Sequence, residues 1–189
     1  MSKHHIQTLV EVALCAAIAL LIDLFIPSLS PGLKITVKML PIFILSLRRG
    51  VKAGLAGGFL WGALQVLAGD AQILTVIQFI IEYGLAFAFL GFAGFLRPGF
   101  QKALKNSRQG KSQAVMLAIA ACIMGSFMRY AMHYIAGVWF WGEYAPAGQS
   151  PYLYSLIVNG GAFLSETLTC CIVIAILVAL YPKLFKPRL

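Results

Sequence analysis

The sequence is poor in charged residues and poorest in acidic ones. Only 11% of its 189 residues are charged, and the 15 lysines and arginines outnumber the 6 aspartates and glutamates. By contrast, 60% of the residues are hydrophobic and the mean hydropathy is +0.87. A soluble domain cannot cover its surface with so few charges, so the bilayer must solvate most of the molecule. We therefore predict an all-α integral membrane protein, with residues 1–189 as one transmembrane domain.

Signature motifs of several enzyme and transporter classes are also missing. The sequence has no GxSxG elbow and no HExxH pair, so serine and zinc hydrolysis are poorly supported. It has no Walker A motif, so an ATP-driven role would need another subunit. No internal duplication of the kind found in secondary transporters is apparent. The chain is therefore not expected to be an enzyme.

The four cysteines provide no redox or metal motif. Cys15, Cys122, Cys170 and Cys171 all fall in apolar runs, without a CxxC pair or a histidine at metal-ligand spacing. They are expected to be small packing residues. Neither a metal site nor a cofactor is expected.

Charge is distributed unevenly among the connections, and the net charge is +9. Basic residues of membrane proteins collect in cytoplasmic loops beside anionic lipid, so this charge does not predict nucleic-acid binding. The basic segments are residues 48–52, residues 97–111 and the tail with Lys183, Lys186 and Arg188. Residues 27–34, 138–150 and the connection around Asp70 are expected outside. Both termini are thus predicted to lie in the cytoplasm.

Six apolar runs approach the length of about 20 residues that a membrane-spanning helix needs. They cover residues 8–26, 35–47, 51–68, 72–96, 113–137 and 152–180. The first is interpreted as a retained helix, because it contains Glu11 and Asp23 and lacks a cleavage site. The second is short and carries Lys38, which a snorkelling side chain and a tilted helix or thinned bilayer would accommodate.

Polar residues inside these runs recur at helical spacing. Ionisable groups at such depth are costly, so they are expected to face the bundle interior or a wet cavity. With the orientation above, the polar residues of the third to sixth runs, called helices 3 to 6, face the outer compartment. This predicts one outward-opening pocket between these helices. The stripes are Trp61 and Gln65; Gln78 and Glu82; Ser126, Arg129, His133 and Gly137; and Tyr152, Ser155, Asn159 and Glu166.

Simpler roles are open for several of these residues. Glu166 and Arg129 can pair to neutralise each other, and His133 can be a packed, hydrogen-bonded residue. Trp139 and Tyr152 can belong to an aromatic belt at the membrane boundary. A belt does not explain a carboxylate, an amide and an imidazole converging from different helices. With the aromatic faces nearby, the anionic Glu82 favours a flat, cationic, nitrogen-rich small molecule.

Several motifs resemble the thiamine-specific S component of energy-coupling factor (ECF) transporters. They are "EYGLAF" from Glu82, "LGFAG" from Leu90, "LPIFILSLRRG" from Leu40, and "RYAMHYIAGVWFWGEYAPAGQSPYLYSLIVNG" from Arg129. The resemblance covers nearly the whole chain. It implies a high-affinity thiamine-binding subunit in a bacterial plasma membrane, with a transmembrane coupling protein and two cytoplasmic ATPases as partners. The site residues it implies are Trp61, Glu82, Tyr83, His133, Gly137, Trp141, Tyr154 and Asn159.

Two further expectations follow from the resemblance. Ala13 and Ala17 match an AxxxA surface for docking on the coupling protein, although ordinary helix packing would explain them equally well. The first outer loop has no aromatic residue, so other contacts must close the site. The rival hypotheses are an S component for another vitamin and a self-sufficient secondary transporter.

Overall fold

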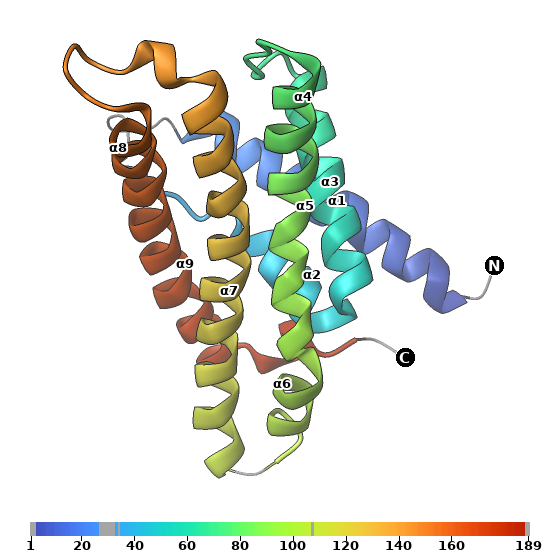
Figure 1. Ribbon diagram of the computed structural model, residues 1–189. Coiled ribbons are helices and arrows are strands. Elements are labelled where there is room, and N and C mark those ends of the chain that lie inside the picture. The colour runs from blue at the N-terminus through green and yellow to red at the C-terminus, as the bar shows by residue number, and fades with distance from the viewer. Residues whose placement is uncertain (1–2, 27–32, 34, 107, 188–189) are drawn as a thin grey trace.

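The computed structural model describes residues 3–26, 33, 35–106 and 108–187, and there the chain forms six helical columns with no paired strands (Figure 1). The all-α, six-helix prediction is confirmed. The first three columns are α1 (Lys3–Phe25), α2 (Leu40–Arg49) and α3 (Val51–Leu67). The fourth joins α4 (Val76–Phe79), π-helical η1 (Ile80–Ala86), α5 (Phe87–Phe89), 3₁₀-helical η2 (Leu90–Leu96) and α6 (Arg97–Ala103). The fifth is α7 (Arg108–Phe140), and the sixth joins α8 (Pro151–Ser155), π-helical η4 (Leu156–Gly160) and α9 (Gly161–Leu180). Two 3₁₀ turns, η3 (Gly142–Tyr144) and η5 (Pro182–Phe185), complete the described elements.

The helices differ in length from the sequence expectations. Four are long and apolar enough to cross a membrane, namely His4–Phe25, Val76–Lys105, Gly110–Phe140 and Pro151–Leu180. The predicted span 35–47 is wrong at both ends: α2 has only 10 residues, Leu40–Arg49, with Pro41 in its first turn and Gly50 directly after its end. Proline favours the first turn of a helix, and Gly50 has a φ of 96°, which ends α2 before α3 starts. The expected linker 97–111 is also largely helical, because α6 continues the fourth column and α7 begins at Arg108.

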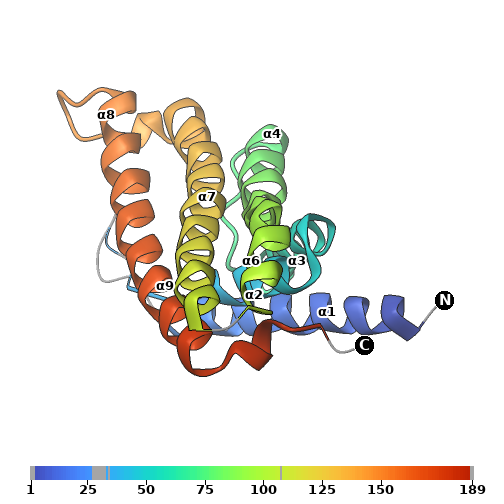
Figure 2. The ribbon, with the colours of Figure 1, turned by 90° about the horizontal axis from the view of Figure 1, so that it is seen from below.

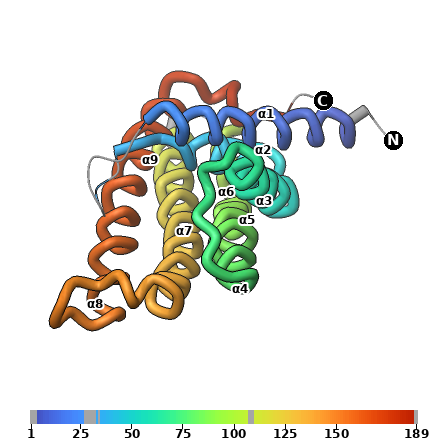
Figure 3. Tube along the Cα trace, turned by 90° about the horizontal axis from the view of Figure 1, so that it is seen from above, coloured from blue at the N-terminus to red at the C-terminus, as the bar shows by residue number. Residues whose placement is uncertain are grey.

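The long columns stand side by side, and α1 crosses them. The axes of the fourth column, α7 and α9 are roughly parallel in Figure 1, with the chain running along α7 in the opposite direction to the other two. Figures 2 and 3 show α1 lying across one side of this group, with its N-terminal part extending past α3. α1 contacts α2 and α3. One long face of α1 is therefore free of the rest of the bundle, and large apolar side chains such as Leu9 and Leu14 are exposed there.

Glycines let α3 and the fourth column meet backbone to backbone. A Cβ added at Gly62 would clash with the carbonyl oxygen of Tyr83, and one at Gly58 with that of Phe87. A Cβ at Gly54 would lie 2.7 Å from the Cα of Gly91. Small residues at spacing of four allow such close approach of membrane helices. This glycine seam, defined by Gly54, Gly58 and Gly62, brings η1, α5 and η2 of the fourth column into close contact with α3.

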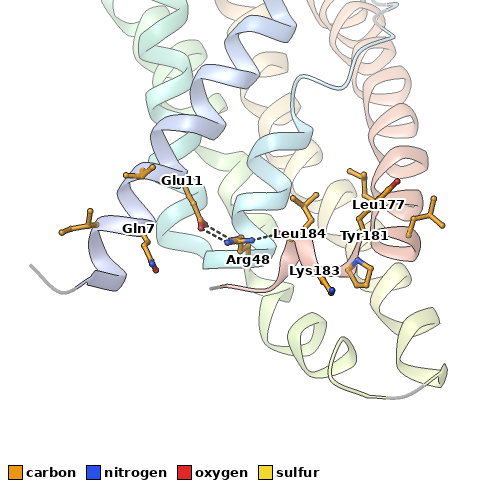
Figure 4. A pocket seen from close by; sticks show the side chains of 11 residues that line it. Gln7, Glu11, Arg48, Leu177, Tyr181, Lys183 and Leu184 are labelled. Atoms are coloured by element: carbon orange, nitrogen blue, oxygen red, sulfur yellow. Dashed lines mark hydrogen bonds and ion pairs between the residues drawn. The ribbon is translucent and has the colours of Figure 1, made fainter. Parts of the chain in front are cut away.

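An ionic clamp joins α1 to α2 at the end of the molecule nearest α6. Glu11 accepts hydrogen bonds from Arg48 at 2.9 Å and from Arg49 at 2.7 Å, using both carboxylate oxygens with each guanidinium. Arg48 also donates to the carbonyl oxygen of Leu184, which ties the C-terminal segment to the same point (Figure 4). Bidentate pairs of this kind are among the strongest charged contacts. The clamp thus fixes α1 at one end.

The two ends of the molecule separate the basic connections from the neutral ones. α4 and α8 lie at one end in Figure 1, and α6 lies at the other. The Arg97 side chain donates to the carbonyl oxygen of Arg48 at 3.0 Å, so the basic segments 48–52 and 97–106 share the α6 end. This sorting supports the prediction that the α6 end faces the cytoplasm.

Cysteine labelling tests this orientation. A cysteine introduced at Gln149, in the connection before α8, is expected to react with an impermeant thiol reagent applied to intact cells. A cysteine at Asn106, in the connection before α7, is expected to react only after the membrane is opened. The control is the same pair of variants in inverted vesicles, where the labelling should exchange. Labelling of Asn106 in intact cells would reverse the assigned orientation.

Candidate functional site

A cavity of about 690 Å³ opens near the α4 and α8 end and collects most of the predicted site residues. It is bordered by the C-terminal part of α1, the segment before α2, α3, η1, α7 and the sixth column, so it reaches beyond the helices 3 to 6 that the sequence suggested. Seven of the eight predicted site residues line it, namely Glu82, Tyr83, His133, Gly137, Trp141, Tyr154 and Asn159.

Glu82 is the point at which the site's hydrogen bonds meet. Its Oε1 accepts a hydrogen bond of 3.0 Å from Trp141 Nε1, and His133 Nδ1 lies 4.0 Å from the same oxygen. Its Oε2 accepts a hydrogen bond from the side-chain amide of Gln78. The two donors come from different columns, because Gln78 belongs to α4 and Trp141 directly follows α7. A buried carboxylate supported in this way can present negative charge to a ligand in the cavity.

Both π-helical stretches lie at this cavity. Glu82 and Tyr83 belong to η1, and Asn159 belongs to η4. A π turn bonds residue i to i+5, and such turns occur frequently at functional sites. The Asn159 amide donates to the carbonyl oxygen of His133 at 3.3 Å and to Ser155 Oγ at 3.1 Å, which fixes its direction.

Gly137 is a packing position as well as a lining residue. Ser155 Oγ donates to the carbonyl oxygen of Tyr134 at 2.8 Å, which holds the sixth column against α7. A Cβ added at Gly137 would clash with Ser155 Oγ and lie 2.9 Å from the Asn159 amide nitrogen. In the structure, the groups closest to it are side chains of the sixth column.

Trp61 is the one predicted site residue that does not line the cavity. It is fully buried, and its ring packs edge-on against Phe87 with centroids 4.7 Å apart. Arg129, which does line the cavity, lies against both rings: its Cζ is 4.6 Å from the Trp61 centroid and 4.2 Å from that of Phe87. Trp61 therefore supports the cavity wall through this cation–π contact.

A buried ionic network forms the wall beside α1. Lys38 is only 4% exposed and donates to Asp23 at 2.8 Å, and its Nζ lies 3.4 Å from Glu166. The expectation that Lys38 snorkels to the surface is wrong, because two carboxylates hold its ammonium inside. The suggested pair of Glu166 with Arg129 is also not formed: among the described residues, the cation within 4.0 Å of Glu166 is Lys38.

Sequence reasoning did not place Asp23 and Lys38 in the site, although both line the cavity. The signal was present, because an ionisable residue inside a membrane span is a functional candidate by default. Gln65 extends the network, since its amide donates to Asp23 and to Asp70, each at 3.0 Å. Residues 27–32 and 34 of the first outer loop lie outside the described residues, so the expectation about that loop is not addressed.

A second, larger groove of about 940 Å³ lies at the ionic clamp, between α1 and the end of α9 (Figure 4). Most of the side chains around it are apolar, including Ile6, Val10 and Leu177. Of its three charged residues, Glu11 and Arg48 bind each other, and the third is Lys183 (Figure 4). None of the eight predicted site residues lines this groove. It is therefore not the candidate ligand site.

Comparison with known proteins identifies the family. The family described as thiamine transporter protein (Thia_YuaJ) matches residues 9–186. The chain belongs to this thiamine transporter family. It is 36% identical to the thiamine transporter ThiT of Lacticaseibacillus paracasei over 194 residues, covering 100% of this chain and 95% of that protein. It is 34% identical to ThiT of Bacillus subtilis over 181 residues, covering 94% and 93%.

A solved structure shares the fold. ThiT from Listeria monocytogenes superposes with a TM-score of 0.91 at 37% identity, covering 97% of this chain and 99% of that one. The resemblance to thiamine-specific S components is thereby confirmed. This member of the thiamine transporter family is a multi-pass cell-membrane protein, and its function is transport and not catalysis.

In this thiamine transporter, exchanging Gly137 for alanine is expected to weaken thiamine binding. The added methyl group must push Ser155 and Asn159 away from α7, and overpacking of this kind costs about 1 to 3 kcal/mol. Titration of purified protein measures the change. The matched control is Gly84→Ala, where a Cβ meets nothing within 4 Å. Equal affinities for the two variants would show that the contact between α7 and the sixth column does not position Asn159.

Proposed function

We propose that this chain is the high-affinity thiamine-binding subunit of an ATP-driven ECF importer, and that it captures thiamine from outside in the cavity around Glu82. The observation that carries the proposal is the convergence of Glu82, Trp141, His133 and Asn159 on one cavity of about 690 Å³. A volume of this size suits a small vitamin, since ligand pockets measure about 300 to 1,000 Å³.

The chemistry of the lining suits the two rings of thiamine. The positive thiazolium favours the carboxylate of Glu82, and the indole of Trp141 provides a face for a cation–π contact worth up to about 2 kcal/mol. The aminopyrimidine has donors and acceptors that match the Asn159 amide and the Tyr154 hydroxyl. Among the charged residues lining the cavity, Asp23, Asp70 and Glu82 outnumber Lys38 and Arg129, which favours a cation.

Titration of the purified protein with thiamine tests the ligand. Trp141 belongs to the cavity, so binding is expected to change the tryptophan fluorescence. Competition with a pyridine or flavin vitamin separates thiamine from the ligand of another S component. Displacement of thiamine by such a compound at equal concentration, or the absence of thiamine binding, would contradict the proposal.

Docking on the coupling protein is the second part of the proposal. Ala13 and Ala17 are exposed on α1, whereas Ala16 and Ala19 are buried against the bundle. An exposed pair of small residues four apart can receive a partner helix at close range. Proteoliposomes containing this chain alone address the rival secondary transporter. Concentrative thiamine uptake without ATPase subunits would favour that rival.

A further inference from the structure

Gln78 is a fully buried amide whose polar atoms all have partners close to the cavity. It lies in α4, one turn before Glu82, and its exposed fraction is 0%. Its Nε2 donates to Glu82 Oε2 and, at 3.0 Å, to the carbonyl oxygen of Gln72. Its Oε1 accepts a hydrogen bond of 3.1 Å from the backbone N–H of Leu74. Gln78 therefore joins the carboxylate of the candidate site to the chain segment that precedes its own helix.

That segment, residues 72–75, lies at the mouth of the cavity and has no regular secondary structure. Gln72 lines the cavity, and its backbone N–H donates to the hydroxyl of Tyr83 at 3.0 Å. The segment is thus held by side chains of Gln78 and Tyr83, on either side of Glu82 in the sequence.

The two oxygens of Glu82 have separate roles in this arrangement. Oε2 is bound by Gln78 on its own helix, and Oε1 is directed to Trp141 and His133. A carboxylate that is held on one oxygen keeps its other oxygen in a fixed direction, which reduces the ordering cost of binding. A shorter side chain at position 78, such as Asn, could not reach both Glu82 and the backbone of residues 72 and 74.

We propose that Gln78 is a positioning residue: it aims the Glu82 carboxylate into the cavity and couples it to the segment 72–75 at the cavity mouth. The inference rests on the proposed thiamine site and adds a residue that does not itself line the cavity. Loss of the Gln78 amide should free Glu82 to turn and should release the segment, so thiamine should bind more weakly and leave faster.

A double-mutant cycle tests whether Gln78 acts through Glu82. Gln78→Met keeps the approximate size and removes the hydrogen bonds. It is expected to weaken thiamine binding by about tenfold or more, since a hydrogen bond to a charged group is lost. In a Glu82→Gln background the same exchange is expected to cost several-fold less, because only the hydrogen bonds to residues 72 and 74 are then left to lose. Equal losses in both backgrounds would make Gln78 a general structural residue and overturn the inference.

Two further variants control for folding and for loss of an amide. Gln78→Asn keeps the amide but shortens it, and it enters the same cycle with the same expected outcomes if Gln78→Met does not fold. Gln101→Met removes an amide of α6 that donates to the backbone carbonyls of Leu47 at 2.8 Å and Phe185 at 2.9 Å, far from the cavity along the same column. Its thiamine affinity is expected to stay within about twofold of the parent.

The parent protein separates failure of this inference from failure of the proposed function. If the unmodified protein does not bind thiamine, the proposed site itself is contradicted. If it binds thiamine and Glu82→Gln weakens binding, but Gln78→Met leaves both the affinity and the dissociation rate unchanged, only the role of Gln78 is overturned.

Discussion

Exchanging Ala17 for tryptophan is expected to abolish ATP-dependent thiamine uptake while leaving thiamine binding intact. Ala17 is exposed on the free face of α1, so the fold can accept the larger side chain. A partner helix that approaches at close range cannot, because such contacts depend on small residues. Uptake into cells that carry the ATPase module and titration of the purified protein are measured on the same variant.

The control places the same ring on a different face. Met116, in α7, is 63% exposed, so Met116→Trp should leave both uptake and binding unchanged. Normal uptake by Ala17→Trp would show that α1 docks through another surface or not at all. Joint loss of folding and binding would instead make Ala17 an internal packing residue, against its exposed position.

Exchanging Glu82 for glutamine is expected to weaken thiamine binding by about 1.5 to 3 kcal/mol, the range for hydrogen bonds to a charged group. The exchange preserves size but removes the negative charge to which Trp141 and Gln78 donate. A bound cation then loses its anionic partner in a place where water does not replace it. Fluorescence titration of the folded variant gives the loss directly.

Glu143→Gln is the matched control, because it removes the same charge from an exposed residue of η3 that does not line the cavity. Its effect should stay below about 0.5 kcal/mol, as for most surface substitutions. If the two variants lose the same affinity, long-range attraction of the cation explains the result, and direct contact between Glu82 and the bound cation is contradicted.

The sequence predicted those parts of the site that depend on helical spacing. Glu82, His133 and Asn159 stand out as polar residues in apolar runs, and their spacing placed them on inward faces. Trp61 had the same signal but lies behind the wall, because spacing gives the face of a helix and not the depth of a side chain. Its ring packs against Arg129, which lies between Trp61 and the cavity.

The ionic wall could not be derived in the same way. Lys38 and Asp23 are 15 residues apart: Asp23 lies in α1, and Lys38 lies in the non-helical residues 35–39 before α2. No periodic pattern brings two such segments together. The π turns were also missed, since a search for a 3.6-residue period assumes that every turn is α-helical. The length of α2 was misjudged because its apolar run continues into residues 35–39, which are not helical.

The π-helical stretch in the fourth column also sets the angle between the faces that the column presents before and after it. Each residue of an α-helix turns the chain by about 100°, and a π turn takes up one residue more than an α turn. Glu82 lies in η1 and faces the cavity, whereas Gly91, further along the same column, faces Gly54 of the glycine seam on α3. Deleting one residue from η1 would restore α-helical winding and rotate these two faces out of phase. Natural variation in chain length should therefore avoid this stretch and concentrate in the connections.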